Sequence, residues 1–164
     1  MTRAKIHKTN AMRELERAKI PFELHTYDPD DGQPDALGVH VAEQLGEDPA
    51  CVFKTLVTVS PAGTHVTCCI PVARELDLKA AARAAQEKSL SMLPLRDLLP
   101  KTGYVRGGCS PIGMKKKFKT IIDESCLAQG TMMVSGGARG VQIELAPADL
   151  VSFCSAVCAP ICHE

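Results

Sequence analysis

The chain has 164 residues, 45% of them hydrophobic, which predicts one compact domain and excludes an intrinsically disordered protein. Nineteen Lys and Arg balance 19 Asp and Glu, and this zero formal charge argues against a uniformly basic nucleic-acid module and a polyacidic tail protein. With no Trp, two Tyr and four Phe, the core must be mainly aliphatic, and few side chains can stack on bases.

Hydrophobic periodicity and turn signals predict the elements of the first half of the chain. Thr9 and Asn10 begin an amphipathic helix that stops near Pro21. There follow, in order, a strand over 22–27, an acidic loop over 28–34, a helix over 39–45, a hairpin of strands over 52–59 and 64–70, and a helix over 78–85 with Asp77 as its N-cap.

The second half begins with a short helical turn and a glycine-rich stretch, over 95–99 and 103–113. Three strands and a final helix are then predicted, over 118–122, 132–134, 141–145 and from Pro147 to about Ala159. Because strands and helices are mixed without strict βαβ alternation, this order favours an α+β fold with a mixed sheet over a doubly wound fold.

The zero net charge conceals a segregation along the sequence. Segments 1–21 and 51–119 carry net charges of +4 and +8, whereas segments 22–50 and 120–164 carry −8 and −4. A fold that gathers the positive segments on one face would attract an anionic ligand, with the acidic segments lying away from that face. The alternative is ordinary interspersed surface charge, and composition does not choose between the two.

The eight cysteines are expected to be free thiols. Residues 1–19 are charged throughout and lack the apolar centre of a signal peptide, and no run approaches the roughly 18 apolar residues of a membrane span. In a reducing compartment the cysteines would pack as small apolar residues. We therefore expect a cytoplasmic protein without membrane association.

Lys54 is the most informative residue of the sequence. Over 52–57, the period of two places Val52, Lys54 and Leu56 on one strand face, and both faces are largely apolar. A lysine within an inner strand is costly to bury unless it has a partner or borders a cleft, which points to a functional role. The alternative is an edge strand whose lysine extends to water.

Two glycine-rich loops, 106–113 and 135–140, could bring backbone N–H groups close to a carbonyl oxygen or a phosphate, although turns between strands need glycines just as often. A basic run follows the first loop, and it either meets phosphates or forms a solvated face. The run consists of Lys115, Lys116, Lys117 and Lys119. A P-loop is excluded, because Met114 stands where the glycine spacing requires Lys.

The cysteines offer two further candidates for chemistry. Cys109, in a glycine loop near basic residues, is the best candidate for a reactive thiol, and burial would leave it inert. Cys154, Cys158 and Cys162 precede His163, but their spacing matches no zinc pattern, so packing along the final helix is favoured over metal binding.

Four segments of the sequence follow one another as in the YbaK/EbsC family of aminoacyl-tRNA editing proteins, relatives of the insertion domain of bacterial prolyl-tRNA synthetase. They are IPFELHTY (20–27), VFKTLV (52–57), TGYVRGGCSPIG (102–113) and VSGGARG (134–140). The chain resembles this family over about residues 8–158, and within it the Cys-tRNA(Pro) deacylase branch. The resemblance implies an extension over 1–7, one editing domain over 8–164, and a mixed, mostly antiparallel and partly barrel-like sheet with peripheral helices.

The resemblance also implies trans-editing, in which a second site destroys a product that the synthetase pocket cannot reject by size. In the family the cysteinyl thiol attacks its own ester carbonyl, giving a thiolactone and free tRNA, which makes the enzyme a hydrolase or, by this route, a lyase. No enzyme nucleophile, metal or cofactor is then expected, and Ser110 and Ser135 have no adjacent base in the sequence. The implied partners are the aminoacylated 3′ end of tRNA and prolyl-tRNA synthetase, not DNA.

The family pattern assigns a role to each matching residue. Lys54 is essential and would hold the terminal ribose or phosphate, or the carbonyl oxygen. The pocket would be lined by Tyr27, Gly107, Gly108, Ser110, Ser135 and Gly136, and tRNA phosphates would meet Lys115, Lys116, Lys117 and Lys119.

Two departures from the family leave alternatives open. Gln142 stands where the family often has Asp, so no carboxylate acts there, and Cys109 replaces a usual aliphatic residue. The alternatives are an editing deacylase for Ala- or Ser/Thr-charged tRNA, and a non-catalytic module that binds a nucleotide or a tRNA end.

Overall fold

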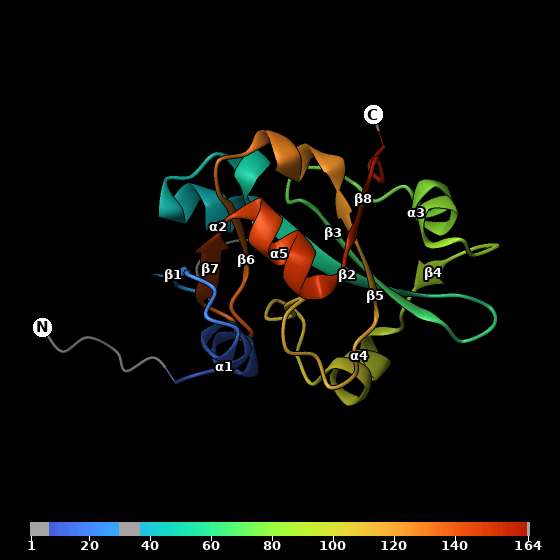
Figure 1. Ribbon diagram of the computed structural model, residues 1–164, viewed down its shortest axis with the longest axis horizontal. Coiled ribbons are helices and arrows are strands. Elements are labelled where there is room, and N and C mark those ends of the chain that lie inside the picture. Colours follow the sequence, from blue (N-terminus) through green and yellow to red (C-terminus); the bar gives the residue numbers. More distant parts are fainter. Residues whose placement is uncertain (1–6, 30–36, 164) are drawn as a thin grey trace, which may run out of the picture.

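The computed structural model describes residues 7–29 and 37–163 (Figure 1). Its α-helices are α1 (Asn10–Arg17), α2 (Leu37–Leu45), α3 (Leu78–Ala85), α4 (Leu95–Thr102) and α5 (Pro147–Cys154), with short 3₁₀ turns η2 (Pro49–Cys51) and η3 (Glu124–Ala128). Its strands are β1 (Glu23–Thr26), β2 (Phe53–Val59), β3 (His65–Pro71), β4 (Ser91–Met92), β5 (Lys119–Asp123), β6 (Met132–Ser135), β7 (Val141–Leu145) and β8 (Val157–Ala159). Within these ranges no helix has the length and apolar character needed to cross a membrane.

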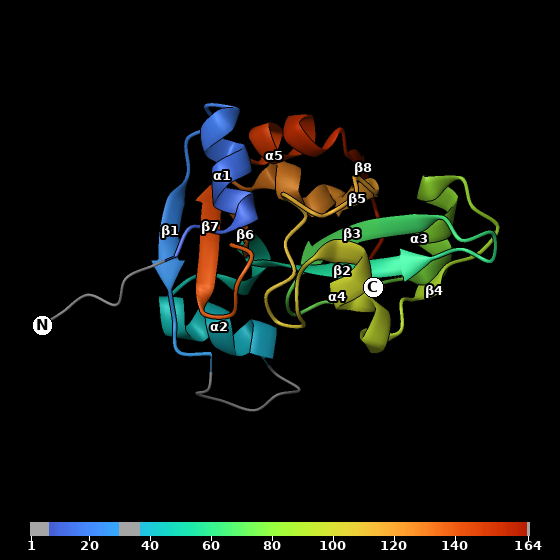
Figure 2. The same ribbon diagram turned by 90° about the horizontal axis from the view of Figure 1, so that it is seen from below.

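The strands form two sheets, which lie side by side in Figure 2. One is antiparallel, in the order β1-β7-β6, and the other is mixed, in the order β4-β2-β3-β5-β8. In the mixed sheet β3, β5 and β8 run parallel, while β2 is antiparallel to β3. A parallel bridge between Val52 and Met133 joins the two sheets, and the strands of the described residues do not close into a barrel. The α+β class with a mixed sheet is confirmed.

Local capping explains where two of the helices begin. The Thr9 hydroxyl accepts a hydrogen bond from the Met12 N–H at 3.2 Å, which satisfies a free donor of the first turn of α1. The Asp77 carboxylate accepts from the N–H groups of Lys79 and Ala80, both at 3.1 Å, at the start of α3. Both predicted helices and the predicted Asp77 N-cap are confirmed.

The core is aliphatic, as the composition predicts. The apolar faces of α1 and α5 pack on one side of the sheets around Phe53 and Ile122, and α3 packs its alanines on the other side of the mixed sheet around Ile70. Burial of a large apolar side chain such as Phe53 or Ile70 contributes about 1.5–3 kcal/mol to the free energy of folding, relative to leaving it exposed. α2 lies opposite α1 and α5 (Figure 2), where Ala42 contacts Val52.

Two boundary predictions need correction. The final helix ends at Cys154, because Ser155 adopts a left-handed conformation (φ 51°), and the chain continues as β8 beside β5. The short helix extends past Leu99 to Thr102 and contains Pro100. The acidic loop predicted over 28–34 lies mostly outside the described residues.

Candidate active site

One face of the antiparallel sheet is polar although its other face belongs to the core. The register pairs His25 with Gln142, and Gln142 in turn with Ser135 on β6. Because paired residues of neighbouring strands point to the same side, these three side chains share one face. The alternate residues, such as Ile143, are fully buried on the opposite face. The polar side chains of this face are therefore candidates to contact a ligand.

Lys54 extends this polar face from the mixed sheet. Val52 forms a parallel bridge with Met133 and packs against it, and two residues further along each strand stand Lys54 and Ser135. Since successive side chains alternate, Lys54 lies on the same side as Val52. The lysine is half-buried, and its ammonium forms no hydrogen bond or ion pair with any described residue.

The predicted position of Lys54 in an inner strand holds only in part. β2 lies between β3 and β4, but β4 pairs only with Thr58 and Val59, so its edge at Lys54 faces β6 instead. This explains how a lysine is tolerated in an apolar strand: it stands at the junction of the two sheets. Its catalytic role stays a prediction.

The two glycine loops are in backbone contact at this junction. A Cβ atom on Gly108 would lie 3.0 Å from the Arg139 nitrogen and 3.1 Å from the Cα and carbonyl carbon of Ala138. Gly107 has a φ of 85°, a conformation that favours glycine. Gly136 donates its N–H to the Val141 carbonyl at 2.9 Å, which closes the turn after Ser135. The predicted loops therefore come together in space.

Tyr27, Ser135 and Ser110 are each held by backbone hydrogen bonds near these loops. The Tyr27 N–H donates to the Gly140 carbonyl at 3.0 Å, which ties the residue to the loop after β6. The Ser135 hydroxyl accepts from the Gly137 N–H at 3.2 Å, and the buried Ser110 hydroxyl accepts from the Ile112 N–H at 3.3 Å. Ser110 thus braces its own loop.

The basic run does not form one patch. Lys119 donates to the Ala85 carbonyl at 2.6 Å, at the C-terminal end of α3, where a cation is favourable. Lys117 contacts the Ser155 hydroxyl at 3.5 Å, and the Lys115 side chain packs beside Gly103. Lys115, Lys116 and Lys117 are exposed, so three of the four lysines remain accessible to phosphates.

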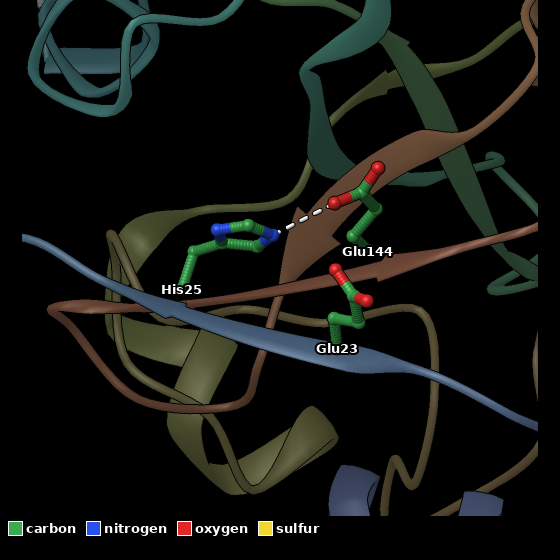
Figure 3. Close-up of side chains that lie close together, drawn as sticks. All are labelled: Glu23, His25 and Glu144. Atoms are coloured by element: carbon green, nitrogen blue, oxygen red, sulfur yellow. Dashed lines mark hydrogen bonds and ion pairs between the residues drawn. The ribbon is translucent and has the colours of Figure 1, made fainter.

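A cluster that the sequence analysis missed lies on the polar face (Figure 3). His25 Nε2 is 2.8 Å from Glu144 Oε1, and the Thr131 hydroxyl donates to Oε2. The bond from Thr131, followed by that to His25, lowers the pKa of Glu144 below its usual value. Glu23 lies beside them, and the three ligand atoms are all within 4.8 Å of one another, close enough to hold a divalent ion. No pattern in the sequence reports this cluster, because His25 and Glu144 meet only through the register of β1 with β7.

Gln142 is an anomaly at the centre of this face. It is only 6% exposed, and its Oε1 atom has no hydrogen-bond donor among the described residues. Buried polar atoms are nearly always paired, so such an atom needs a reason. Its cross-strand neighbours are Ser135 and His25. An Oε1 atom without a donor at this position fits a binding site in which a ligand donates the missing hydrogen bond.

The cysteines contribute packing rather than reactivity. Burial raises the pKa of both Cys109 and Cys154 to about 12, so neither forms a thiolate readily. Cys154 lies in the core, whereas Cys158 stands on β8 and not on the same helix, which corrects the predicted stripe. Among the described residues the three C-terminal cysteines do not form a metal-binding group.

Acidic residues lie closer to the site than the charge pattern predicts. Burial raises the pKa of Cys51, three residues before Lys54, and the nearby carboxylates of Glu47, Asp48 and Glu144 raise it further. The expectation that both acidic segments lie away from the site is therefore wrong. The reason is topological, because β7 and the turn before β2 carry acidic residues into the sheet junction.

Comparison with known proteins agrees with this geometry. The family model of the aminoacyl-tRNA editing domain matches residues 36–153. A protein of Enterococcus faecalis, EbsC, named as a candidate Cys-tRNA(Pro)/Cys-tRNA(Cys) deacylase, is 46% identical over 146 residues, which are 89% of this chain and 88% of that protein.

Two crystal structures share the fold. Hypothetical protein APE2540 superposes with a TM-score of 0.83 at 20% identity, covering 94% of this chain and all of that one. A candidate trans-editing enzyme for prolyl-tRNA synthetase superposes with a TM-score of 0.81 at 19% identity, covering 94% and 96%. With the family model spanning most of its length, the chain belongs to the aminoacyl-tRNA editing domain family.

Proposed function

We propose that this protein is a trans-editing deacylase that removes cysteine from mischarged Cys-tRNA(Pro). The observation that carries this is Lys54, which is half-buried at the junction of the two sheets, at the position that matches Ser135, and forms no hydrogen bond or ion pair with the described residues. The similarity to the Enterococcus protein, over nearly the whole of both chains, supports the substrate class. Prolyl-tRNA synthetase in the cytoplasm is the proposed partner, because it would supply the mischarged tRNA.

The chemistry uses the nucleophile of the substrate. The cysteinyl sulfur attacks its own ester carbonyl carbon, a C–S bond forms, the ester C–O bond breaks, and the thiol proton passes to the leaving 3′ oxygen of the ribose. The products are a thiolactone and free tRNA. The protein then needs to position the ester and to stabilise the negative charge that develops on the carbonyl oxygen.

Each residue of the site has a proposed part in that task. Lys54 stabilises the carbonyl oxygen or holds the terminal ribose or phosphate, and the backbone of Gly107 and Gly108 contacts the ester. Ser135 hydrogen-bonds the substrate, and Tyr27 forms a wall of the pocket. The buried thiols supply no competing nucleophile, since burial raises the pKa of Cys109 to about 12.

The test is a deacylation assay with Cys-, Ala- and Ser-charged tRNA(Pro), and with Cys-tRNA(Cys) for tRNA selectivity. Lys54→Ala should lower the rate with the Cys substrate by about 10²–10³, the usual cost of removing a group that stabilises an oxyanion. Lys88→Ala is the matched control, because Lys88 is exposed and stands apart from the site. Full activity of Lys54→Ala would remove the proposed role, and preferred hydrolysis of Ala- or Ser-tRNA would assign another editing substrate.

A further inference from the structure

A second surface feature lies on the far side of the first glycine loop. It is a groove of about 200 Å³ between α1, α5 and the basic run. Its walls include Phe118, Phe153 and Met114, and Lys116 and Lys117 stand on its rim. The groove is separate from the polar face that carries Lys54, and none of the chemistry proposed above uses it.

The aromatic content of the groove is unusual for this chain. The protein has four Phe and no Trp, and two of the four Phe line this groove. Both are half-buried, so part of each ring remains accessible. Phe118 already stacks on His65, with ring centroids 4.9 Å apart and planes inclined by 17°. Accessible rings beside cations are the usual platform for an unpaired nucleotide base.

The charge of the groove is positive on balance. Lys116 and Lys117 are exposed, and the Lys117 ammonium lies 3.5 Å from the Ser155 hydroxyl. Glu14 is the acidic residue of the lining, and it pairs with Arg17 at 3.4 Å. Two exposed ammonium groups against one carboxylate that is paired with Arg17 favour an anionic ligand.

The groove and the candidate active site share a wall. Pro111 and Gly113 line the groove, while Gly108, in the same loop, abuts the backbone of Ala138 and Arg139 in the site. The Asn10 side chain donates to the Gly113 carbonyl at 2.9 Å and so holds this loop against the start of α1. The first glycine loop therefore links the groove structurally to the candidate active site.

We propose that this groove binds an unpaired nucleotide preceding the terminal adenosine of the tRNA, with its base against Phe153 and its phosphate against Lys116 and Lys117. This rests on the proposed function, because it assumes that the aminoacylated adenosine occupies the site around Lys54. It extends that function by giving the protein a second contact, specific for the single-stranded end rather than for the amino acid.

Binding can be tested without catalysis. Phe153→Trp introduces a single tryptophan into a protein that has none, and Leu127→Trp, at a side chain 64% exposed, is the control. The RNA trinucleotide CCA should quench the fluorescence of Phe153→Trp saturably, through stacking, and adenosine alone should not. Equal quenching of both tryptophans, or none of Phe153→Trp in a variant with wild-type circular dichroism, would overturn the proposal.

Kinetics provide an independent test in the wild-type aromatic background. The double variant Lys116→Gln/Lys117→Gln should raise KM for Cys-tRNA(Pro) at least tenfold more than KM for 3′-O-cysteinyl adenosine. The slope of log KM against log salt should fall by about 1.4, since each lost single-strand phosphate contact removes roughly 0.7. The control is Lys79→Gln/Lys88→Gln, which carries the same charge change on exposed residues in and just after α3.

The outcomes separate the two proposals. The groove proposal would be overturned if Lys116→Gln/Lys117→Gln raised KM equally for both substrates, or changed KM no more than the control pair does. Neither result would contradict the proposed deacylase function. If the wild-type protein hydrolyses neither substrate, the proposed function fails, and the quenching experiment still decides whether the groove binds the CCA end. If the Lys116→Gln/Lys117→Gln substitutions abolish binding to prolyl-tRNA synthetase but leave the quenching of Phe153→Trp by CCA unchanged, the groove is instead assigned to a protein partner.

Discussion

Replacing Gly108 with alanine tests whether contact between the two glycine loops sets the geometry of the site. The new Cβ would lie 3.0–3.1 Å from three backbone atoms of Ala138 and Arg139. Favourable carbon contacts begin at about 3.5 Å, so the loops must separate by about 0.5 Å. Backbone atoms cannot rotate away as a side chain can. We expect a loss of about 1–3 kcal/mol in the free energy of unfolding, as for other overpacked sites.

The same displacement should reduce catalysis. A misplacement of about 1 Å can cost about 10²-fold, so half of that shift should lower kcat by roughly tenfold. Urea unfolding and single-turnover deacylation measure the two effects. Gly130→Ala is the matched control, because a Cβ there has no neighbour within 4 Å, and its stability should be unchanged or slightly higher. If Gly108→Ala has the same free energy of unfolding and the same deacylation rate as Gly130→Ala, the contact between the loops does not determine the geometry of the site.

Three further predictions follow from buried and titrating groups. Gln142→Met removes an acceptor that has no donor among the described residues, so urea unfolding should show a gain of about 1 kcal/mol while deacylation falls; a clear loss of stability would contradict this. The lowered pKa of Glu144 stabilises the fold above the unfolded value near 4.5, a contribution that disappears as pH falls through the folded pKa. Glu144→Gln should therefore be less stable than wild type at pH 7, and the difference in the free energy of unfolding, measured by urea titration, should become smaller below pH 4.5. A difference that does not change with pH would show that the ionised Glu144 is not its source. Iodoacetamide at pH 8 should label Cys51 before the buried Cys109, as seen by peptide mass mapping, and Cys109→Ala should retain the deacylation rate; rapid labelling of Cys109 would contradict its burial.

Much of the fold can be predicted from the sequence, because local sequence signals and tertiary packing favour the same elements. Asp77 and the alanine-rich turn that follows it specify α3, and the apolar run 52–59 specifies β2. The end of the last helix is different. Leu150, Cys154 and Cys158 continue a helical spacing, but the pairing of Ile122 with Cys158 in β8 overrides it. Strand pairing across the chain is a tertiary interaction, and the periodicity of one segment does not report it.

The candidate site shows the same division. Lys54 stands out from the sequence because a charge in an apolar strand conflicts with its surroundings. His25 and Glu144 do not, since each alternates normally within its own strand, and only the register between β1 and β7 brings them to 2.8 Å. The unmet acceptor of Gln142 is likewise a property of the packed sheet. A residue whose character conflicts with its own segment can be predicted from the sequence. A residue that gains its role only through the pairing of distant strands cannot.

The pairing of β1 with β7 has a consequence for how the protein is made. The antiparallel sheet joins Glu23–Thr26 to Val141–Leu145, so its polar face draws on both ends of the chain. During synthesis from the N-terminus, β1 has no strand partner until β7 has left the ribosome, and contacts of such long sequence separation form slowly. The nascent chain therefore completes its binding face last. An interrupted translation product would carry Lys54 and the first glycine loop, yet could not assemble an editing site.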